Sequence, residues 1–291
     1  MHRFRHQVAA ITGAGSGMGR ALAQQLASLG CHVAIADVNA EGLAETTALI
    51  KAQFANPESA TASANKDAVT VSSHILDVAD RQAMEQFAED VVTAHGKVNM
   101  IFNNAGVSVT DSVAHMSDEN FEWLMGINFW GVVYGTRAFL PRLCATEPGH
   151  IVNTSSIFGT IAVPGQSAYN ASKFAVRGFT YALRMELADS HPHLGVSCVQ
   201  PGGVKTNIVN HSRYLPSDNQ APTKEEFAAR FEAIAMLDST QAAKQILKGV
   251  RKNRAQILVG KDARLLALLE RILPVGYMRL IRKGMNGQGP A

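Results

Sequence analysis

The chain has 291 residues, of which 46% are hydrophobic and 18% are charged, and its formal net charge is +3. This composition is that of a globular protein, and no apolar run approaches the about 18 residues that a membrane-spanning helix requires. The charge is unevenly divided: residues 241–291 carry eleven Lys and Arg against Asp262 and Glu270, whereas residues 1–240 sum to −6. A basic tail on an acidic body suggests an anionic partner or a membrane surface, although most such tails are only solvated.

The beginning of the chain and its cysteines indicate a cytoplasmic protein. A basic heptapeptide passes directly into an apolar run, so no secretory signal is predicted. Cys31, Cys144 and Cys198 lack metal-ligand spacing and are expected to be reduced. His191 and His193 have no third ligand nearby, so we predict no metal site. We also predict no nucleic-acid partner.

Short apolar runs alternate with helical patterns almost to the end of the chain. The predicted strands are Val8–Thr12, His32–Asp37, Val69–Leu76, Met100–Asn103, His150–Thr154, Gly195–Gln200 and Gln256–Val259. The predicted helices between them include Arg20–Leu29, Ala40–Phe54, Arg81–His95 and Asp118–Leu140. Because several strands are continuous hydrophobic runs, we predict an α/β fold with a doubly wound, Rossmann-like, seven-stranded parallel sheet covered by helices on both faces.

The alternation stops near residue 260, which predicts one domain over residues 1–260 and a C-terminal helical extension over 261–291. Within the domain, Asn56–Asp67 is small and polar and is expected to form a surface loop before the third strand. Residues 206–237 form a longer insertion with a predicted helix around Lys224–Ala235. A long loop beyond the carboxyl end of a strand is a candidate lid over the active-site crevice.

The first strand runs into a glycine-rich turn, and a helix follows at once. The turn contains Thr12, Gly13, Ser16, Gly17, Met18 and Gly19, in the pattern TGxxxGxG. Glycines allow a pyrophosphate to approach the backbone, and a helix N-terminus offers free N–H groups and the positive end of its dipole. The strict G-x-G-x-x-G spacing is absent, but the position between strand and helix predicts nucleotide binding.

Asp37 closes the second strand, 18 residues after Gly19. A carboxylate at this position can accept hydrogen bonds from the adenosine ribose hydroxyls and would repel a 2′-phosphate, although it can also cap the next helix. Because its neighbours Ser16 and Val38 are uncharged, we predict NAD rather than NADP as the cofactor.

Tyr169 and Lys173 are i and i+4 neighbours on a helix that follows Gly165, with Ser167 as its candidate cap. An ammonium at about 4 Å, in an effective dielectric of about 20, favours tyrosinate by about 4 kcal/mol before desolvation is counted. The pair therefore predicts a tyrosine that acts as an acid or base. A bare YxxxK pair is more often an ordinary surface pair, so the other motifs of the chain decide whether this pair is catalytic.

With these motifs, the chain resembles the short-chain dehydrogenase/reductase family over about residues 5–260. The resemblance rests on TGxxxGxG at 12–19, Asp77 and Val78 in LDV, Asn103-Asn104-Ala105-Gly106, Asn128, Ser156 with Tyr169 and Lys173, and PGGVKTN at Pro201–Asn207. It implies that NAD is held by Thr12, Gly13, Ser16, Gly17, Met18, Gly19, Asp37, Asp77, Val78, Asn104, Ala105, Gly106, Tyr169, Lys173, Pro201, Gly202, Val204 and Thr206.

The resemblance also implies a hydride transfer between the nicotinamide cofactor and a secondary alcohol or ketone. Tyr169 would exchange a proton with the substrate oxygen, which Ser156 would hold. Lys173 would lower the pKa of the tyrosine and bind the nicotinamide ribose. Asn128 would hold a water that links Lys173 to solvent.

The substrate is less strongly indicated than the reaction. Apolar residues near the catalytic set are Ile157, Phe158, Val163 and Pro164, with Tyr214, Phe231 and Met236 from the long loop. They favour a small hydrophobic molecule, such as a steroid, a lipid-derived or a small aliphatic carbonyl compound, or they simply pack the lid. Two other functions stay open, a non-catalytic NAD(P)-sensing interaction protein and a sugar-nucleotide epimerase or dehydratase. The intact catalytic set argues against the first, and the absence of a larger C-terminal substrate domain argues against the second.

The extension contains an apolar helical pattern, Ala263–Leu273, which Pro274 and Gly276 interrupt before YMRLIRK follows. It could be a basic amphipathic segment lying on anionic lipid, or a helix docked on its own subunit or a neighbour, which we prefer. The resemblance further implies a homodimer or homotetramer. The small residues Ala175, Gly178 and Ala182 of the Tyr169 helix would permit close packing between subunits.

Overall fold

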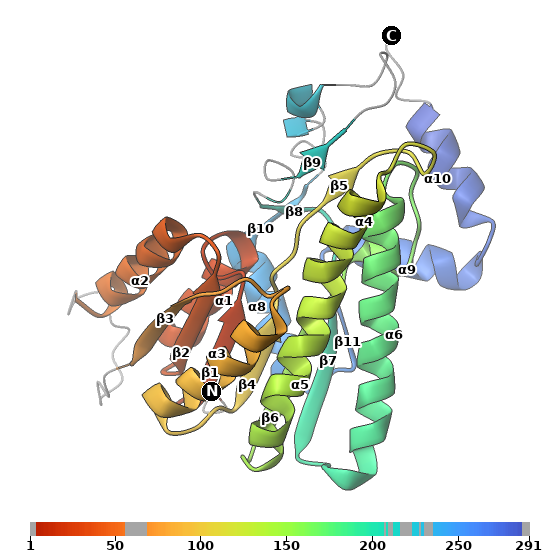
Figure 1. Cartoon of the computed structure of the whole chain (residues 1–291). Helices are drawn as coiled ribbons and strands as arrows, with labels where there is room; N and C mark the ends of the chain where they lie inside the picture. The colour runs from red at the N-terminus through yellow and green to blue at the C-terminus, as the bar shows by residue number, and fades with distance from the viewer. Residues whose placement is uncertain are drawn as a thin grey trace.

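The computed structural model describes residues 4–55, 69–206, 208, 212–215, 223–226, 228–229 and 235–286. Its centre is a parallel sheet of seven strands in the order β11-β7-β6-β4-β1-β2-β3 (Figure 1). The strands are β1 Val8–Thr12, β2 His32–Asp37, β3 Val71–Ile75, β4 Met100–Asn103, β6 Gly149–Thr154, β7 Leu194–Pro201 and β11 Gln256–Val259. The predicted doubly wound sheet is confirmed. From β1 the chain builds outward first through β2 and β3 and then, on the other side, through β4, so the strand order reverses between β1 and β4.

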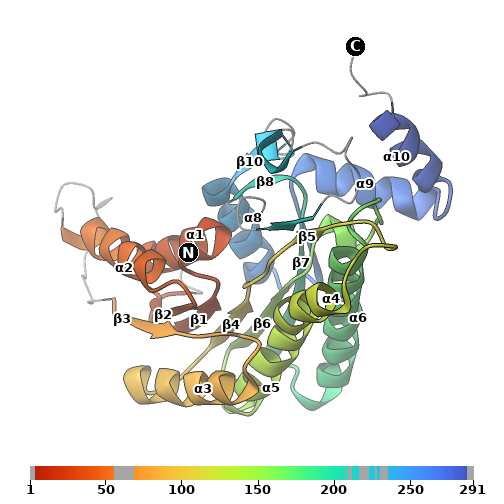
Figure 2. The ribbon, with the colours of Figure 1, turned by 45° about the horizontal axis from the view of Figure 1, so that its top comes forward.

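Helices cover both faces of this sheet (Figure 2). They are α1 Gly17–Ser28, α2 Ala40–Ala55, α3 Arg81–His95, α4 Asp118–Met125, α5 Gly131–Cys144, α6 Ser167–Ser190, α8 Ser239–Arg251, α9 Lys261–Ile272 and α10 Tyr277–Asn286. One apolar core contains residues of α1, α2 and α8, and the other contains residues of α3, α5 and α6. The two cores account for the continuous apolar runs of the strands, since both faces of each central strand must be apolar.

Alternation along β1 shows how one run of apolar residues serves both cores. Ala9 and Ile11 belong to the core under α1 and α8, whereas Val8 and Ala10 belong to the core under α3 and α5. Successive side chains of a strand point to opposite faces of the sheet, so an apolar residue is needed at every position.

The structure differs from the predicted helices at several points, and α1 begins at Gly17 rather than at Arg20. The predicted helix Asp118–Leu140 extends to Cys144, and a π-helical turn, η2 Gly126–Trp130, separates its α4 and α5 parts. Ser167, the predicted cap of α6, is instead its first helical residue, and Gln166 stands at the cap without a side-chain hydrogen bond to the helix.

Four two-residue strands were not predicted. β5 Val109–Thr110 pairs with β9 Arg213–Tyr214, and β8 Val204–Lys205 pairs with β10 Leu237–Asp238. These pairs connect the predicted lid region to the segments that follow β4 and β7. Within the predicted lid helix, residues 224–226 and 228–229 are helical. Ala235, at its predicted end, is buried but not helical. The remaining residues of this helix, including Phe231, and the predicted loop Asn56–Asp67 lie outside the described residues.

The C-terminal extension packs on its own chain. Ala263 of α9 and Tyr277 of α10 are buried in a cluster with Ile157 and Ile161, which follow β6. The hydroxyl oxygen of Tyr277 accepts a hydrogen bond from the backbone N–H of Ala162 at 3.0 Å. The described helices include none that is both long and apolar enough to cross a bilayer.

Candidate active site

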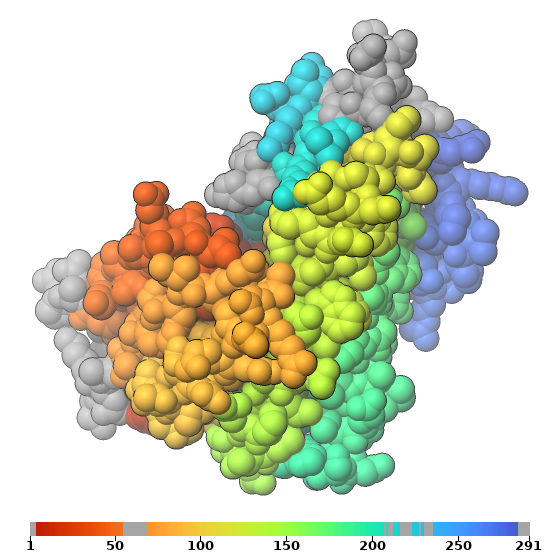
Figure 3. All heavy atoms as spheres, viewed as in Figure 1, coloured from red at the N-terminus to blue at the C-terminus, as the bar shows by residue number. Residues whose placement is uncertain are grey.

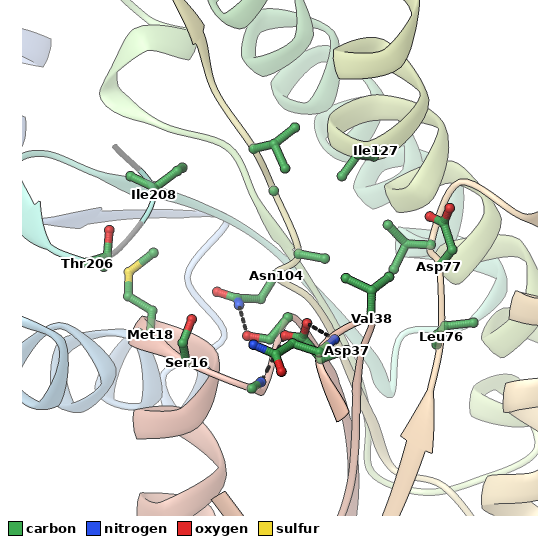
Figure 4. Close-up of a pocket in the computed structure, with 18 residues that line it drawn as sticks. Ser16, Met18, Asp37, Val38, Leu76, Asp77, Asn104, Ile127, Thr206 and Ile208 are labelled. Atoms are coloured by element: carbon green, nitrogen blue, oxygen red, sulfur yellow. Dashed lines mark hydrogen bonds between the residues drawn. The ribbon is translucent and has the colours of Figure 1, made fainter. Parts of the chain in front are cut away.

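A crevice with a volume of about 360 Å³ lies beyond the carboxyl ends of β1, β2 and β4, where the strand order reverses. Such a switch point is where doubly wound sheets bind ligands. The described residues that line it are Gly13, Gly15, Ser16, Gly17, Met18, Asp37, Val38, Asn39, Leu76, Asp77, Val78, Asn104, Ala105, Gly106, Val107, Ile127, Thr206 and Ile208. Figure 4 shows Met18, Thr206 and Ile208 on one side of it, and Leu76, Asp77 and Ile127 on the other.

The turn between β1 and α1 forms one wall of the crevice. Gly13 and Gly17 have φ of +66° and +51°, which side-chain-bearing residues rarely adopt, and a Cβ on Gly13 would lie 2.7 Å from the Cα of Ala105. Ser16 caps α1 without any side-chain hydrogen bond to the first turn. The N–H groups of that turn therefore stay available, and together with the helix dipole they fit the pyrophosphate of a dinucleotide.

Thr12 holds residues of the crevice wall in place through hydrogen bonds. Its hydroxyl oxygen accepts hydrogen bonds from the backbone N–H groups of Asn104 and Ala105, at 3.0 and 3.1 Å. The side-chain amide of Asn104 donates back to the carbonyl oxygen of Thr12 at 3.1 Å. The Oδ1 atom of Asn104 is buried and has no hydrogen-bond partner among the described residues, which leaves an acceptor at the wall of the crevice. Thr12 thus positions lining residues without lining the crevice itself.

Asp37 lies where the sequence places an acid for the adenosine ribose. Its carboxylate accepts hydrogen bonds from the backbone N–H groups of Gly15 at 2.9 Å and Asn39 at 3.0 Å. Arg20, which sequence reasoning did not consider, donates to the carbonyl oxygen of Gly15 and to Glu45 at 2.6 Å. Arg20 is therefore paired with Glu45, and no cationic side chain lies among the described residues that line the crevice.

The four predicted catalytic residues lie beside the crevice, and none of them is among the residues that line it. The Nζ atom of Lys173 lies 5.5 Å from the centre of the Tyr169 ring and donates to the carbonyl oxygen of Thr154 at 3.1 Å. Tyr169 is hydrogen-bonded to Ser156. A Cβ built on Gly106, a lining residue, would lie 3.4 Å from Nζ of Lys173. The group thus lies next to the crevice wall formed after β4.

Asn128 reaches the same place from the π-helical turn η2. Its Oδ1 atom accepts from the backbone N–H of Val107 at 2.8 Å, and its Nδ2 donates to the carbonyl oxygen of Val107 at 2.9 Å. Nδ2 also lies 3.3 Å from the hydroxyl of Ser172. Asn128 is completely buried, so it holds the strand extension after β4 in place beside Lys173.

Burial controls the titration of the central pair. It raises the pKa of Tyr169 to about 12, and the hydrogen bond to Ser156 acts in the opposite direction. Burial also lowers the pKa of Lys173 to about 8, with a small opposing effect of Cys198. The structure thus does not show the expected lowering of the tyrosine pKa by Lys173. The amine of Lys173 donates to the carbonyl oxygen of Thr154. Desolvation of the phenol affects the tyrosine pKa more strongly than the charge of this amine does.

Seven predicted cofactor residues do not line the crevice: Thr12, Gly19, Tyr169, Lys173, Pro201, Gly202 and Val204. Gly202 instead packs against Asp262 of α9, whose carboxylate accepts from the backbone N–H of Gly203 at 2.6 Å. Sequence reasoning missed the lining residues Gly15, Val38, Asn39, Leu76, Val107, Ile127 and Ile208. Most of these are adjacent in the sequence to predicted residues, and this adjacency was the only feature of the sequence that could have identified them. In the described part of the chain, no three His, Cys, Asp or Glu side chains are placed to hold a metal ion.

Comparison with known proteins gives consistent matches over almost the whole chain. A family model described as short chain dehydrogenase matches residues 7–214. SadH of Mycobacterium tuberculosis, which carries the name of an oxidoreductase, is 42% identical over 98% of this chain and 97% of its own length. Estradiol 17-beta-dehydrogenase 11 of Homo sapiens is 28% identical, with coverages of 96% and 83%. A short-chain dehydrogenase/reductase from Burkholderia phymatum, solved in complex with NAD, has a TM-score of 0.80 at 31% identity, with coverages of 94% and 95%.

Proposed function

The chain belongs to the short-chain dehydrogenase/reductase family and is an NAD(P)-dependent oxidoreductase, and on that premise we propose that it interconverts a hydrophobic secondary alcohol and its ketone, with NAD as the preferred cofactor. The observation that carries the proposal is the meeting of Ser156, Tyr169 and Lys173 beside the wall of a crevice whose glycine turn fits a dinucleotide.

In this proposal the bound nicotinamide supplies the hydride acceptor or donor, and the protein handles the proton. Ser156 positions the substrate oxygen, and Tyr169 takes its proton during oxidation and returns it during reduction. Lys173, when protonated, favours the phenolate and so assists the oxidation. Asn128 keeps the wall beside Lys173 in place, and its Oδ1 retains one lone pair for a water that connects the amine to solvent.

Replacement of the phenol tests this assignment. We expect Tyr169→Phe to bind NADH about as tightly as the wild type but to lose turnover by at least about a hundredfold, because acid–base catalysis contributes about 10² to 10⁴. NADH binding is followed by calorimetry and turnover by absorbance. Tyr181→Phe, on the same helix, is the matched control and should keep full activity. A Tyr169→Phe enzyme that turns over like the control would refute the role.

The preference for NAD is supported by Asp37, because its carboxylate lines the crevice without a free cation nearby. Asp37→Asn keeps an acceptor for the N–H of Gly15 but removes the charge that would repel a 2′-phosphate. We expect the ratio of kcat/KM for NAD over NADP to fall by at least about tenfold, equivalent to about 1.4 kcal/mol. Glu41→Gln, an exposed charge in the first turn of α2, is the control and should leave the ratio unchanged. An unaltered ratio in Asp37→Asn would contradict the proposed selectivity.

The surroundings of Tyr169 support an apolar substrate. Phe158 contacts its ring edge-on with centroids 6.2 Å apart, and Phe121 and Trp123 pack in the same cluster. Ile157, by contrast, is buried against the C-terminal extension, so we remove it from the substrate-facing set. A relative named for estradiol is consistent with this class. NADH oxidation over a panel of steroid, acyl and small aliphatic ketones tests it, and activity restricted to charged or sugar substrates would reject it.

We also include a homo-oligomer in the proposal. The outward face of α6 carries an exposed stripe of Ala171, Phe174, Gly178, Ala182 and Met185. Phe174 and Met185 are 41% and 72% exposed, and Trp130 of the neighbouring η2 is 46% exposed. Large apolar side chains around small ones are typical of a helix face that packs against a second subunit.

A further inference from the structure

We propose that the outward face of α9 and α10 docks the protein onto an anionic lipid surface. The inward face of the same two helices is already used, since Ala263 and Tyr277 are buried against Ile157 and Ile161. The helices are therefore held in a defined orientation by their own subunit. The outward side of α9 and α10 is a second surface, distinct from the face that packs on the subunit.

The outward face carries a line of large apolar side chains. Leu265, Leu268 and Ile272 follow one another at helical spacing on α9 and are 67%, 54% and 66% exposed. Val275, between the helices, is 72% exposed and Met278 of α10 is 50% exposed. Monomeric proteins seldom leave such a run of large aliphatic residues in water, so it marks a contact surface.

Cationic side chains accompany this apolar line. Arg264 and Arg271 are exposed on α9, and Arg279, Arg282 and Lys283 are exposed on α10. Together with Met278, the three cations of α10 line a hollow in the surface. This arrangement joins positive charge to an apolar group, which suits the phosphate and the first methylenes of a phospholipid.

The two acidic residues of the extension do little to neutralise this face. Asp262 is turned toward the body of the protein, where its carboxylate accepts from the backbone N–H of Gly203 at 2.6 Å. Glu270 is only partly exposed. Residues 1–240 sum to −6, so an anionic surface would repel the body of the protein and attract the extension.

The same charges decide between a lipid surface and a second copy of the chain. In a two-fold dimer the same patch of both subunits forms the contact, so the arginine-bearing face of α9 and α10 would lie against the same face of the other subunit. Like charges brought together in this way are destabilising, whereas an anionic bilayer neutralises them. In Figure 3 the extension, coloured blue, forms one edge of the molecule, from which a flat surface can be reached.

Vesicle co-sedimentation of the full chain tests the proposal. We expect the wild type to pellet with phosphatidylcholine vesicles that contain phosphatidylserine, much less with phosphatidylcholine alone, and less as salt is raised. Arg279→Gln/Arg282→Gln/Lys283→Gln should reduce the partition coefficient at least about tenfold. Lys244→Gln/Lys248→Gln/Lys252→Gln removes the same charge from α8 and the residue after it. It should change the partition coefficient little, since these exposed lysines belong to the helix that packs on α1 and not to the extension.

The apolar line is tested separately. Leu265→Gln/Leu268→Gln should also lose binding to the mixed vesicles, whereas Ile75→Gln, which changes an exposed apolar side chain on β3, should not. Thermal unfolding of each variant shows whether it is folded. The proposal is overturned if folded wild type does not pellet with the anionic vesicles, or if both sets of extension variants pellet like their controls. It is also overturned if Leu265→Gln/Leu268→Gln keeps its vesicle binding but lowers the molecular mass in sedimentation velocity, because the face would then belong to a second copy.

Discussion

At the scale of single residues, Lys173 shows how burial sets the chemistry of the site. The side chain is 3% exposed and its amine bonds to a backbone carbonyl oxygen, that of Thr154. The low dielectric around it favours the neutral form, which lowers its pKa to about 8. Near neutral pH the amine is therefore charged but close to its titration, a range in which it can respond to bound cofactor and substrate.

This lowered pKa has a consequence for stability. Because the folded pKa lies below the unfolded one, the unfolded chain binds more protons between about pH 8 and pH 10.5, so this group stabilises the fold increasingly as pH rises. Between pH 7 and pH 9 we expect a gain on the order of 1 kcal/mol in the free energy of unfolding from Lys173 alone. The contribution of Lys173 is isolated by subtracting the free energy of urea unfolding of Lys173→Met from that of the wild type at each pH, since both proteins share their cysteines and tyrosines.

The exposed Lys248 provides the control for that comparison. Lys248→Met should follow the wild type over the whole pH range, because the exposed amine has the same solvent in both states. If the difference between the wild type and Lys173→Met does not vary with pH, the amine is not desolvated in the folded protein and the pKa given above is wrong.

At the scale of elements, the π-helical turn η2 and the C-terminal helices both act on the site from a distance. η2 places Asn128 so that its amide binds both backbone groups of Val107. An extra residue in a helical turn is common at functional sites, where it redirects a side chain. α9 and α10 pack instead on the segment after Ser156, so the extension supports the wall that carries the catalytic serine.

The hydrogen bond from Ala162 to Tyr277 allows the role of the extension to be measured. Tyr277→Phe keeps the buried ring and removes only the acceptor, so we expect the free energy of unfolding to fall by about 1 kcal/mol. Cleavage by a protease within residues 261–286 should become faster, because the extension opens more often. Tyr134→Phe, which removes a hydroxyl from a partly buried ring of α5, should change neither quantity. Equal proteolysis of both variants would mean that this hydrogen bond does not hold the extension.

At the scale of the whole molecule, the face of α6 permits a test of subunit association that leaves the fold intact. Gly178 has no atom within 4 Å of the position of an added Cβ, so an arginine there meets nothing in its own subunit. We expect Gly178→Arg to lower the mass measured by sedimentation velocity, because the new side chain would collide with a facing subunit. Gly284→Arg, at an equally open glycine of α10, is the matched control. An unchanged mass in Gly178→Arg would exclude this face as the subunit contact.

The amino-acid sequence by itself determined the sheet and the inventory of the site. The seven apolar runs, from Val8–Thr12 to Gln256–Val259, correspond to the seven strands because a strand buried on both faces must be apolar throughout. Chain-local patterns also marked the glycine turn, Asp37 and the Tyr169–Lys173 pair, since each depends on neighbours within a few positions.

Only the tertiary structure decided what depends on residues distant in the chain. The two-residue strands β5 and β9 carry no periodicity of their own and form by pairing across about a hundred residues. The side of α9 that faces Ile157 and the side that faces solvent could not be told apart from an amphipathic pattern alone. The raised pKa of Tyr169 likewise required the fold, because desolvation depends on every group packed around the phenol, whereas sequence spacing records only the nearby amine.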